Sequence, residues 1–171
     1  MIDDDGSPAK VTVDGTDFWT VEYLPFTTDR YSHKFNGPGL RYEIALSIKT
    51  GYIVHINGPF LPGAWPDIKI ARAQLHAMLP HGEYYLADCG YRAIDAPSIT
   101  RDEIAPFERR EMGLLLARHE TINRRFKDWE ILKQQFRHKE ELHGPVFTAI
   151  AVMTQMEIES GHFVYDIEDY Q

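Results

Sequence analysis

The longest helix that this sequence predicts is centred on the stretch Arg118-His119-Glu120-Thr121-Ile122-Asn123-Arg124-Arg125-Phe126-Lys127. Between Phe107 and Phe136 the only helix breaker is Gly113, and apolar residues recur at the spacing of one helical face. We expect that face to be buried; it consists of Leu115, Ile122, Phe126, Trp129, Leu132 and Phe136. The segments before and after this helix indicate what it covers.

Glu120 is the one acidic residue in that stretch, and it is set among cations. At 100° per residue, Arg124 lies about 40° and Lys127 about 20° from Glu120 around the helix axis, opposite Ile122. The charge pattern alone favours the interpretation that Glu120, Arg124 and Lys127 form a solvated face of the helix. A surface ion pair of this kind contributes about 0 to 1 kcal/mol.

Two hairpins are predicted upstream of the helix. Residues 10–23 alternate apolar and polar and are interrupted by Asp14-Gly15, which is typical of a turn between two strands. Residues 40–48 and 52–57 are β-like runs joined by Lys49-Thr50-Gly51. Between the hairpins, residues 31–39 have the composition of an exposed loop.

Alternating helices and strands follow. Asp67 occupies the position of a helix N-cap before an apolar run that ends near Met78. Residues 84–87 predict a strand that leads directly into Asp88, residues 98–100 a short strand, and residues 146–159 a final helix. This order predicts an α/β fold with a mixed β-sheet covered by helices.

The composition fits one intracellular domain. The chain has 171 residues and is 43% hydrophobic, and its only cysteine excludes an internal disulfide or a zinc site built on several thiolates. Neither a signal peptide nor an apolar run of about 18 residues is present. We expect a disordered acidic N-terminus at 1–9, a domain at 10–160 and an acidic tail at 161–171.

Charge is distributed unevenly along the chain. The net charge of −8 argues against a simple nucleic-acid coat, because nonspecific DNA affinity comes mostly from Lys and Arg. Seven Lys or Arg nevertheless accompany three acidic residues in 118–139, whereas 151–171 holds five acids and neither Lys nor Arg. The basic segment is the one that contains Glu120.

Four carboxylates come from separate predicted elements: Asp14, Asp67, Asp88 and Glu120. Asp88 stands at the carboxyl end of a strand, where functional groups of open α/β sheets gather. Carboxylates that converge from several elements suit Mg²⁺, which takes oxygen ligands. Two such ions can activate the attacking oxygen and stabilise the leaving oxygen of a phosphodiester.

The sequence resembles the DDE-superfamily endonucleases, the nuclease domain of Harbinger-type transposases and related bacterial insertion-sequence transposases. The resemblance extends from Val11 to about Glu159. Its motifs, in order, are Val13-Asp14-Gly15-Thr16, Tyr31-Ser32-His33-Lys34, Pro62-Gly63-Ala64-Trp65-Pro66-Asp67, Leu86-Ala87-Asp88-Cys89-Gly90-Tyr91, Arg118 to Lys127, and Phe136-Arg137-His138.

The resemblance implies an RNase H-like fold in which Asp14, Asp88 and Glu120 are catalytic and hold Mg²⁺ or Mn²⁺. Asp67 matches a residue that is often a further metal ligand, and Lys127 matches a cation near the DNA backbone. The candidate DNA contacts are Lys34, Arg118, Arg124, Arg125 and Lys127. A tyrosine and an arginine that relatives carry before the glutamate are replaced by Gly113 and Leu116.

The implied activity is metal-dependent DNA cleavage and strand transfer, by attack of water and then of a DNA 3′-hydroxyl, without a covalent protein intermediate. Relatives carry an N-terminal DNA-recognition region, whereas this chain begins just before the first strand. DNA and a separate recognition protein are therefore the expected partners, with a nuclear location in a eukaryote. The oligomeric state is open, and a homodimer is one option.

Two rival interpretations remain. A catalytically inactive, domesticated or remnant domain that binds DNA or protein fits the missing recognition region and the negative charge. The interpretations without a functional site are that Asp14 is a turn residue, that Asp67 is a helix cap, and that Arg124, Arg125 and Lys127 form a solvated helix face. A zinc metalloprotease is disfavoured, because Asn123 stands where the His-Glu-x-x-His motif needs its second histidine.

Overall fold

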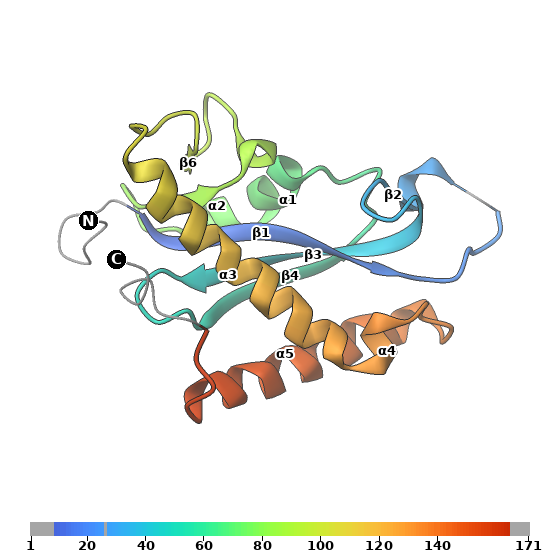
Figure 1. Cartoon of the computed structure of the whole chain (residues 1–171). Helices are drawn as coiled ribbons and strands as arrows, with labels where there is room; N and C mark the ends of the chain where they lie inside the picture. Colours follow the sequence, from blue (N-terminus) through green and yellow to red (C-terminus); the bar gives the residue numbers. More distant parts are fainter. Residues whose placement is uncertain (1–8, 26, 165–171) are drawn as a thin grey trace.

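The structure is a computed structural model and describes residues 9–25 and 27–164 (Figure 1). The strands are β1 (Ala9–Trp19), β2 (Tyr31–Ser32), β3 (Gly37–Ser47), β4 (Ile53–Phe60), β5 (Tyr84–Ala87) and β6 (Ser98–Thr100). The helices are α1 (Asp67–Ala73), α2 (Leu75–Met78), α3 (Glu108–Asp128), α4 (Glu130–Lys133) and α5 (His143–Glu159). Within the described ranges, no helix is long and apolar enough to cross a membrane.

The strands form one mixed sheet, as predicted. β1 lies between β3, which is antiparallel to it, and β5, which is parallel to it. β4 continues the sheet beyond β3, β6 continues it beyond β5, and the short β2 pairs with the start of β3. The second predicted hairpin is confirmed by the antiparallel pairing of β3 with β4.

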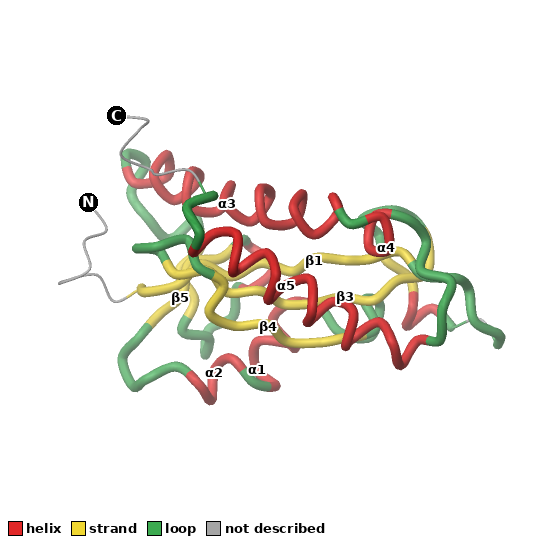
Figure 2. Tube along the Cα trace, turned by 90° about the horizontal axis from the view of Figure 1, so that it is seen from below, coloured by secondary structure: helices red, strands yellow, loops and turns green. Residues whose placement is uncertain are grey.

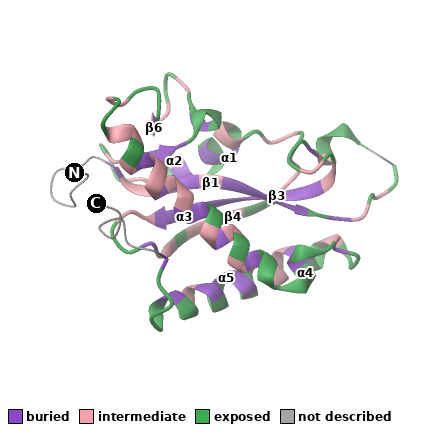
Figure 3. Cartoon of the chain, in the orientation of Figure 1, coloured by how far each residue is buried: buried purple, intermediate pink, exposed green. Residues whose placement is uncertain are grey.

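Helices cover both faces of the sheet. α3 and α5 lie on one face and α1 and α2 on the other (Figures 1 and 2). Phe18 and Ile44 of the sheet pack with Phe126 of α3 and Phe147 of α5 in the larger core cluster. Figure 3 shows this buried layer along β1 and β3. The α/β class with a helix-flanked mixed sheet is therefore confirmed.

The second face has its own, smaller apolar cluster. Val13 and Ala45 of the sheet pack there with Ala71 of α1, Leu75 of α2 and Tyr85 of β5. Strand side chains alternate between faces, so Thr12 and Asp14 lie on the α3 face and Val13 on the α1 face, where a Cβ on Gly15 would meet Asp67.

The first predicted hairpin is wrong. Asp14 and Gly15 lie in the middle of β1, which pairs with β3 without interruption from Val11 to Trp19. β3 supplies a partner for the whole of β1, and this long-range pairing overrides the local turn preference of Asp-Gly.

Two predicted helices are broken. The helix expected from Asp67 to Met78 changes direction at Gln74 and becomes α1 and α2. The long helix ends at Asp128, and Trp129, expected in its buried face, is extended and 39% exposed. The other five residues predicted for that face are buried.

The predicted terminal segments lie mostly outside the described residues. Ala9 is described, and it is buried at the start of β1. The prediction that it belongs to a disordered N-terminus is therefore wrong.

Candidate active site

Asp14 and Asp88 come together because they follow paired residues of two parallel strands. Val13 of β1 pairs with Ala87 of β5, and the aspartates are the next residues along. β5 ends there, whereas β1 continues to Trp19. The β1–β5 ladder therefore stops at Val13 and Ala87, and Asp14 and Asp88 lie just beyond its end.

Side chains satisfy the backbone of β1 just beyond the end of this ladder. Gly15 N donates a hydrogen bond to Asp14 Oδ1 (2.8 Å), and Lys34 Nζ donates to Gly15 O. After β5, Gly90 N donates to Asp88 Oδ1 (2.8 Å), so Asp88 caps the short 3-10 turn Cys89–Tyr91. Both aspartates are thereby fixed at the same edge of the sheet.

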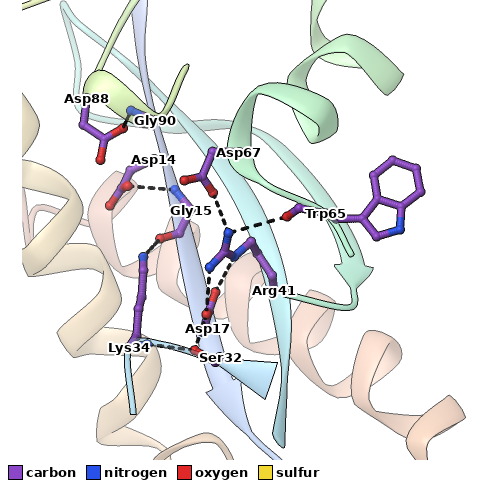
Figure 4. Close-up of polar contacts among 10 residues, drawn as sticks. All are labelled: Asp14, Gly15, Asp17, Ser32, Lys34, Arg41, Trp65, Asp67, Asp88 and Gly90. Atoms are coloured by element: carbon purple, nitrogen blue, oxygen red, sulfur yellow. Dashed lines mark hydrogen bonds and ion pairs between the residues drawn. The ribbon is translucent and has the colours of Figure 1, made fainter. Parts of the chain in front are cut away.

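Asp67 is the third carboxylate at this edge (Figure 4). A Cβ added to Gly15 would lie 2.7 Å from Asp67 Oδ1, and one added to Gly90 would lie 2.9 Å from Asp67 Oδ2 and 3.0 Å from Asp88 Oδ1. Two glycines thus make the room that Asp67 occupies between β1 and the segment after β5.

Asp67 is not the N-cap of α1. It is the first helical residue, Pro66 occupies the cap position, and no side chain caps the helix. The side chain is turned toward the other aspartates and Arg41 instead, with Arg41 Nη1 donating to Asp67 Oδ1 at 3.1 Å.

The proton affinity of the aspartates reflects this crowding. Burial raises the pKa of Asp14 to about 6; Lys34 opposes the rise, and the charges of Asp88 and Asp67 add to it. Burial also raises the pKa of Asp67, against the effects of Arg41 and Lys34. Partly buried carboxylates that repel one another favour a proton or a cation in their midst.

Glu120 is exposed on α3. The charges that act most on Asp14 are those of Lys34, Asp88 and Asp67 rather than that of Glu120. Across residues 9–25 and 27–164, no three acidic, histidine or cysteine side chains are grouped as a ready-made set of metal ligands. Asp14, Asp67 and Asp88 nevertheless interact electrostatically.

The predicted cations separate into two groups. Lys34 lies at the aspartates, and Lys127 of α3 is close enough that Lys34, after the larger effect of burial, lowers the pKa of Lys127. Arg124 is exposed on the same helix.

Arg118 and Arg125 have roles within the fold. Arg118 is only 4% exposed, and its Nη1 donates to the carbonyl of Ile48 (2.6 Å), which removes it from the candidate DNA contacts. Arg125 Nη2 donates to the carbonyl of Phe163 (3.0 Å).

Sequence reasoning missed the charged residues of β3 and the second aspartate of β1. Arg41 forms two hydrogen bonds with Asp17, and Glu43 is fully buried opposite Gly15. Burial, with the nearby charge of Asp67, raises the pKa of Glu43 to about 8, so Glu43 is protonated at neutral pH. The 4.0 Å contact with His55, whose pKa burial lowers, is therefore between neutral groups. A signal existed: Arg41 and Glu43 alternate with apolar residues, which places both on one face of a strand.

No protein-family model matches this chain, and no curated protein or solved structure matches it significantly.

Proposed function

We propose that this chain is an RNase H-like DNA nuclease domain that carries out divalent-metal-dependent phosphodiester cleavage and transposase-type strand transfer. The observation that carries the proposal is the placement of Asp14 and Asp88 directly after the paired residues of parallel strands, with Asp67 between them. The resemblance to the DDE-superfamily endonucleases implies metal-binding carboxylates on the first strand and after the fourth. If the two-residue β2 is set aside, Asp14 and Asp88 occupy those positions.

The three aspartates have the chemistry of a site for Mg²⁺ or Mn²⁺. Hard cations bind carboxylate oxygens and keep some water, so a few carboxylates and a phosphodiester complete their coordination. Burial, and to a lesser extent the charges of Asp88 and Asp67, raises the pKa of Asp14, so its ionised form is disfavoured there and a bound cation would stabilise that form. When bound, such an ion supplies Lewis acidity and an activated attacking oxygen. Glu120 belongs to this proposal only through the resemblance.

Lys34, Lys127 and Arg124 are the groups that we propose to hold DNA. Lys34 reaches the carbonyl of Gly15 beside Asp14, where a phosphate next to a cleaved bond would lie, and Lys127 is close enough to Lys34 for the charge of Lys34 to lower its pKa, after the larger effect of burial. Cations that contact phosphates fix the register of a nucleic acid and make binding depend on salt. Replacing Lys127 with Gln should weaken DNA binding and reduce the slope of log affinity against log salt by about one.

An inactive domain that binds DNA or protein is the second candidate. It is favoured by the net charge of −8, and by the fact that the charges acting most on Asp14 are those of Lys34, Asp88 and Asp67 rather than that of Glu120. An inactive domain would keep the fold and the cationic groups without metal-dependent cleavage.

Plasmid cleavage tests the proposal. The purified chain is incubated with supercoiled DNA and Mn²⁺ or Mg²⁺, alongside Asp14→Asn, Asp88→Asn and the exposed control Asp29→Asn. We expect nicking that needs metal, is lost in both site variants and is kept in the control. Cleavage that survives both substitutions would show that Asp14 and Asp88 are not the catalytic groups, whereas no cleavage together with no Mn²⁺ binding by calorimetry would favour the inactive domain.

A further inference from the structure

A buried ion pair lies directly behind the candidate site. Arg41 Nε donates to Asp17 Oδ1 at 2.7 Å and Nη2 donates to Asp17 Oδ2 at 3.0 Å, which is the bidentate arrangement of a strong Arg–carboxylate pair. The side chain of Asp17 is fully buried and that of Arg41 is 12% exposed. A pair as buried as this costs desolvation energy, so its role need not be stability alone.

The remaining amine of Arg41 reaches the site. Nη1 donates to Asp67 Oδ1 (3.1 Å) and lies 3.5 Å from the carbonyl oxygen of Trp65, so Arg41 contacts both the start of α1 and the loop before it (Figure 4). With Oδ1 turned to Arg41 and Gly15, Oδ2 is the oxygen that borders Gly90 and Asp88. Arg41 therefore fixes the orientation of the Asp67 carboxylate, with one oxygen on the guanidinium and the other toward Gly90 and Asp88.

Asp17 also connects to the loop that carries Lys34. Ser32 Oγ donates to Asp17 Oδ2 (2.5 Å), and the backbone N–H of Lys34 donates to Ser32 Oγ (3.1 Å). Lys34 then extends to the carbonyl of Gly15 beside Asp14. One buried carboxylate thus holds two segments, residues 31–34 and 65–67, against β1.

We propose that Asp17 and Arg41 are positioning residues of the candidate active site: they orient Asp67 for the metal ion and, through Ser32, hold Lys34 beside the DNA phosphate. This proposal rests on the proposed function. A guanidinium suits the task because its planar fork fixes direction as well as charge. Groups that hold metal ligands in place commonly change metal affinity by about 10- to 100-fold when they are removed.

Mn²⁺ titration of the full chain tests the link between Arg41 and Asp67. Wild type, Arg41→Gln, Arg41→Lys and Arg30→Gln are compared by calorimetry, together with Asp67→Asn and the double variant. Arg30 is the matched control, because it pairs with Glu140 away from the aspartates. Circular dichroism and the midpoint of thermal unfolding show whether each variant is folded.

The expected result is that Arg41→Gln weakens Mn²⁺ binding about tenfold in the wild-type background and less than about twofold when Asp67 is already Asn. Arg41→Lys should recover only part of the affinity, and Arg30→Gln should keep it. An equal loss from Arg41→Gln in both backgrounds, or the same loss from Arg30→Gln, overturns the positioning role.

Ser32→Ala tests the other arm. It removes the hydrogen bond from Ser32 to Asp17 but keeps both hydrogen bonds between Arg41 and Asp17. We expect it to raise KM for DNA several-fold while Mn²⁺ affinity stays within about twofold, because the backbone N–H of Lys34 loses its partner while Arg41 still holds Asp67. Unchanged KM overturns this arm.

The two proposals fail in distinguishable ways. Metal-dependent cleavage by wild type with Mn²⁺ affinity that is insensitive to Arg41 overturns the positioning role alone. Absence of both Mn²⁺ binding and cleavage in wild type overturns the proposed function and the positioning role with it.

Discussion

Replacing Asp14 with asparagine should stabilise the metal-free protein near neutral pH. Asparagine is close in size to aspartate, and its Oδ1 can still accept the hydrogen bond from Gly15 N. It cannot ionise, so the cost of holding a charged carboxylate beside Asp67 and Asp88 disappears. The substitution therefore separates the electrostatic cost of the site from its packing.

The raised pKa gives the magnitude and the pH window. The pKa of Asp14 rises from 3.8 to about 6 in the folded protein, chiefly through burial. Each pKa unit corresponds to about 1.4 kcal/mol, so ionised Asp14 lowers the free energy of unfolding by up to about 3 kcal/mol. Below about pH 4 the group is protonated in both states and the cost is absent. The cost appears between about pH 4 and 6 and is complete above pH 6.

Urea denaturation in EDTA at pH 7.5 and pH 4 measures this effect. At pH 7.5 we expect Asp14→Asn to raise the free energy of unfolding by up to about 3 kcal/mol, or the unfolding midpoint by about 6 to 12 °C. At pH 4 the two proteins should differ little, and exposed Asp29→Asn should change neither result. If Asp14→Asn is less stable than wild type at pH 7.5, or shifts both conditions equally, the electrostatic reasoning is refuted.

Three further predictions concern neighbouring groups. Gly90→Ala should weaken Mn²⁺ binding in calorimetry, because the new Cβ would lie 2.9 Å from Asp67 Oδ2; unchanged affinity would contradict the packing. His119 lies 2.9 Å from Thr12 Oγ1, and burial lowers its pKa to about 4. Its contribution to stability is present above about pH 6.5 and lost toward pH 4, so His119→Gln should lessen acid destabilisation in urea titrations. Glu120→Gln should change stability by less than about 0.5 kcal/mol in urea denaturation, since Glu120 is exposed; a larger loss would show a partner within the fold.

Local patterns predicted the fold where one strong periodicity dominated. The helical spacing around Ile122 and Phe126 identified the buried face of α3, and the apolar run before Asp88 identified β5. They failed where a distant segment decided the outcome. Trp129 has the right spacing for the buried face, but the chain turns there so that Phe136 N can donate to Trp19 O of β1 (2.8 Å).

The candidate site was predictable to the extent that strand ends were. Asp88 follows a strand in sequence, and the parallel pairing with β1 then brings Asp14 beside it. Arg41 and Asp17 could not be assigned, because alternation in an isolated strand cannot tell a solvated face from one covered by a helix. α1 covers that face, and the two charges meet beneath it.

The Asp14-Gly15 pair explains why the local rule for turns fails at the site. In an isolated segment Asp-Gly favours a turn, and glycine inside a strand weakens it. Here a Cβ at position 15 would lie 2.7 Å from Asp67 Oδ1, so a larger residue would push the third carboxylate away from its present position. Burial raises the pKa of Asp14, which means that holding its ionised carboxylate there lowers the stability of the fold. Packing of the strand does not require an ionisable residue at this position. Both residues are therefore unfavourable for the strand that contains them, but both suit a site at which carboxylates come together. Departures from local preference of this kind are expected at functional sites.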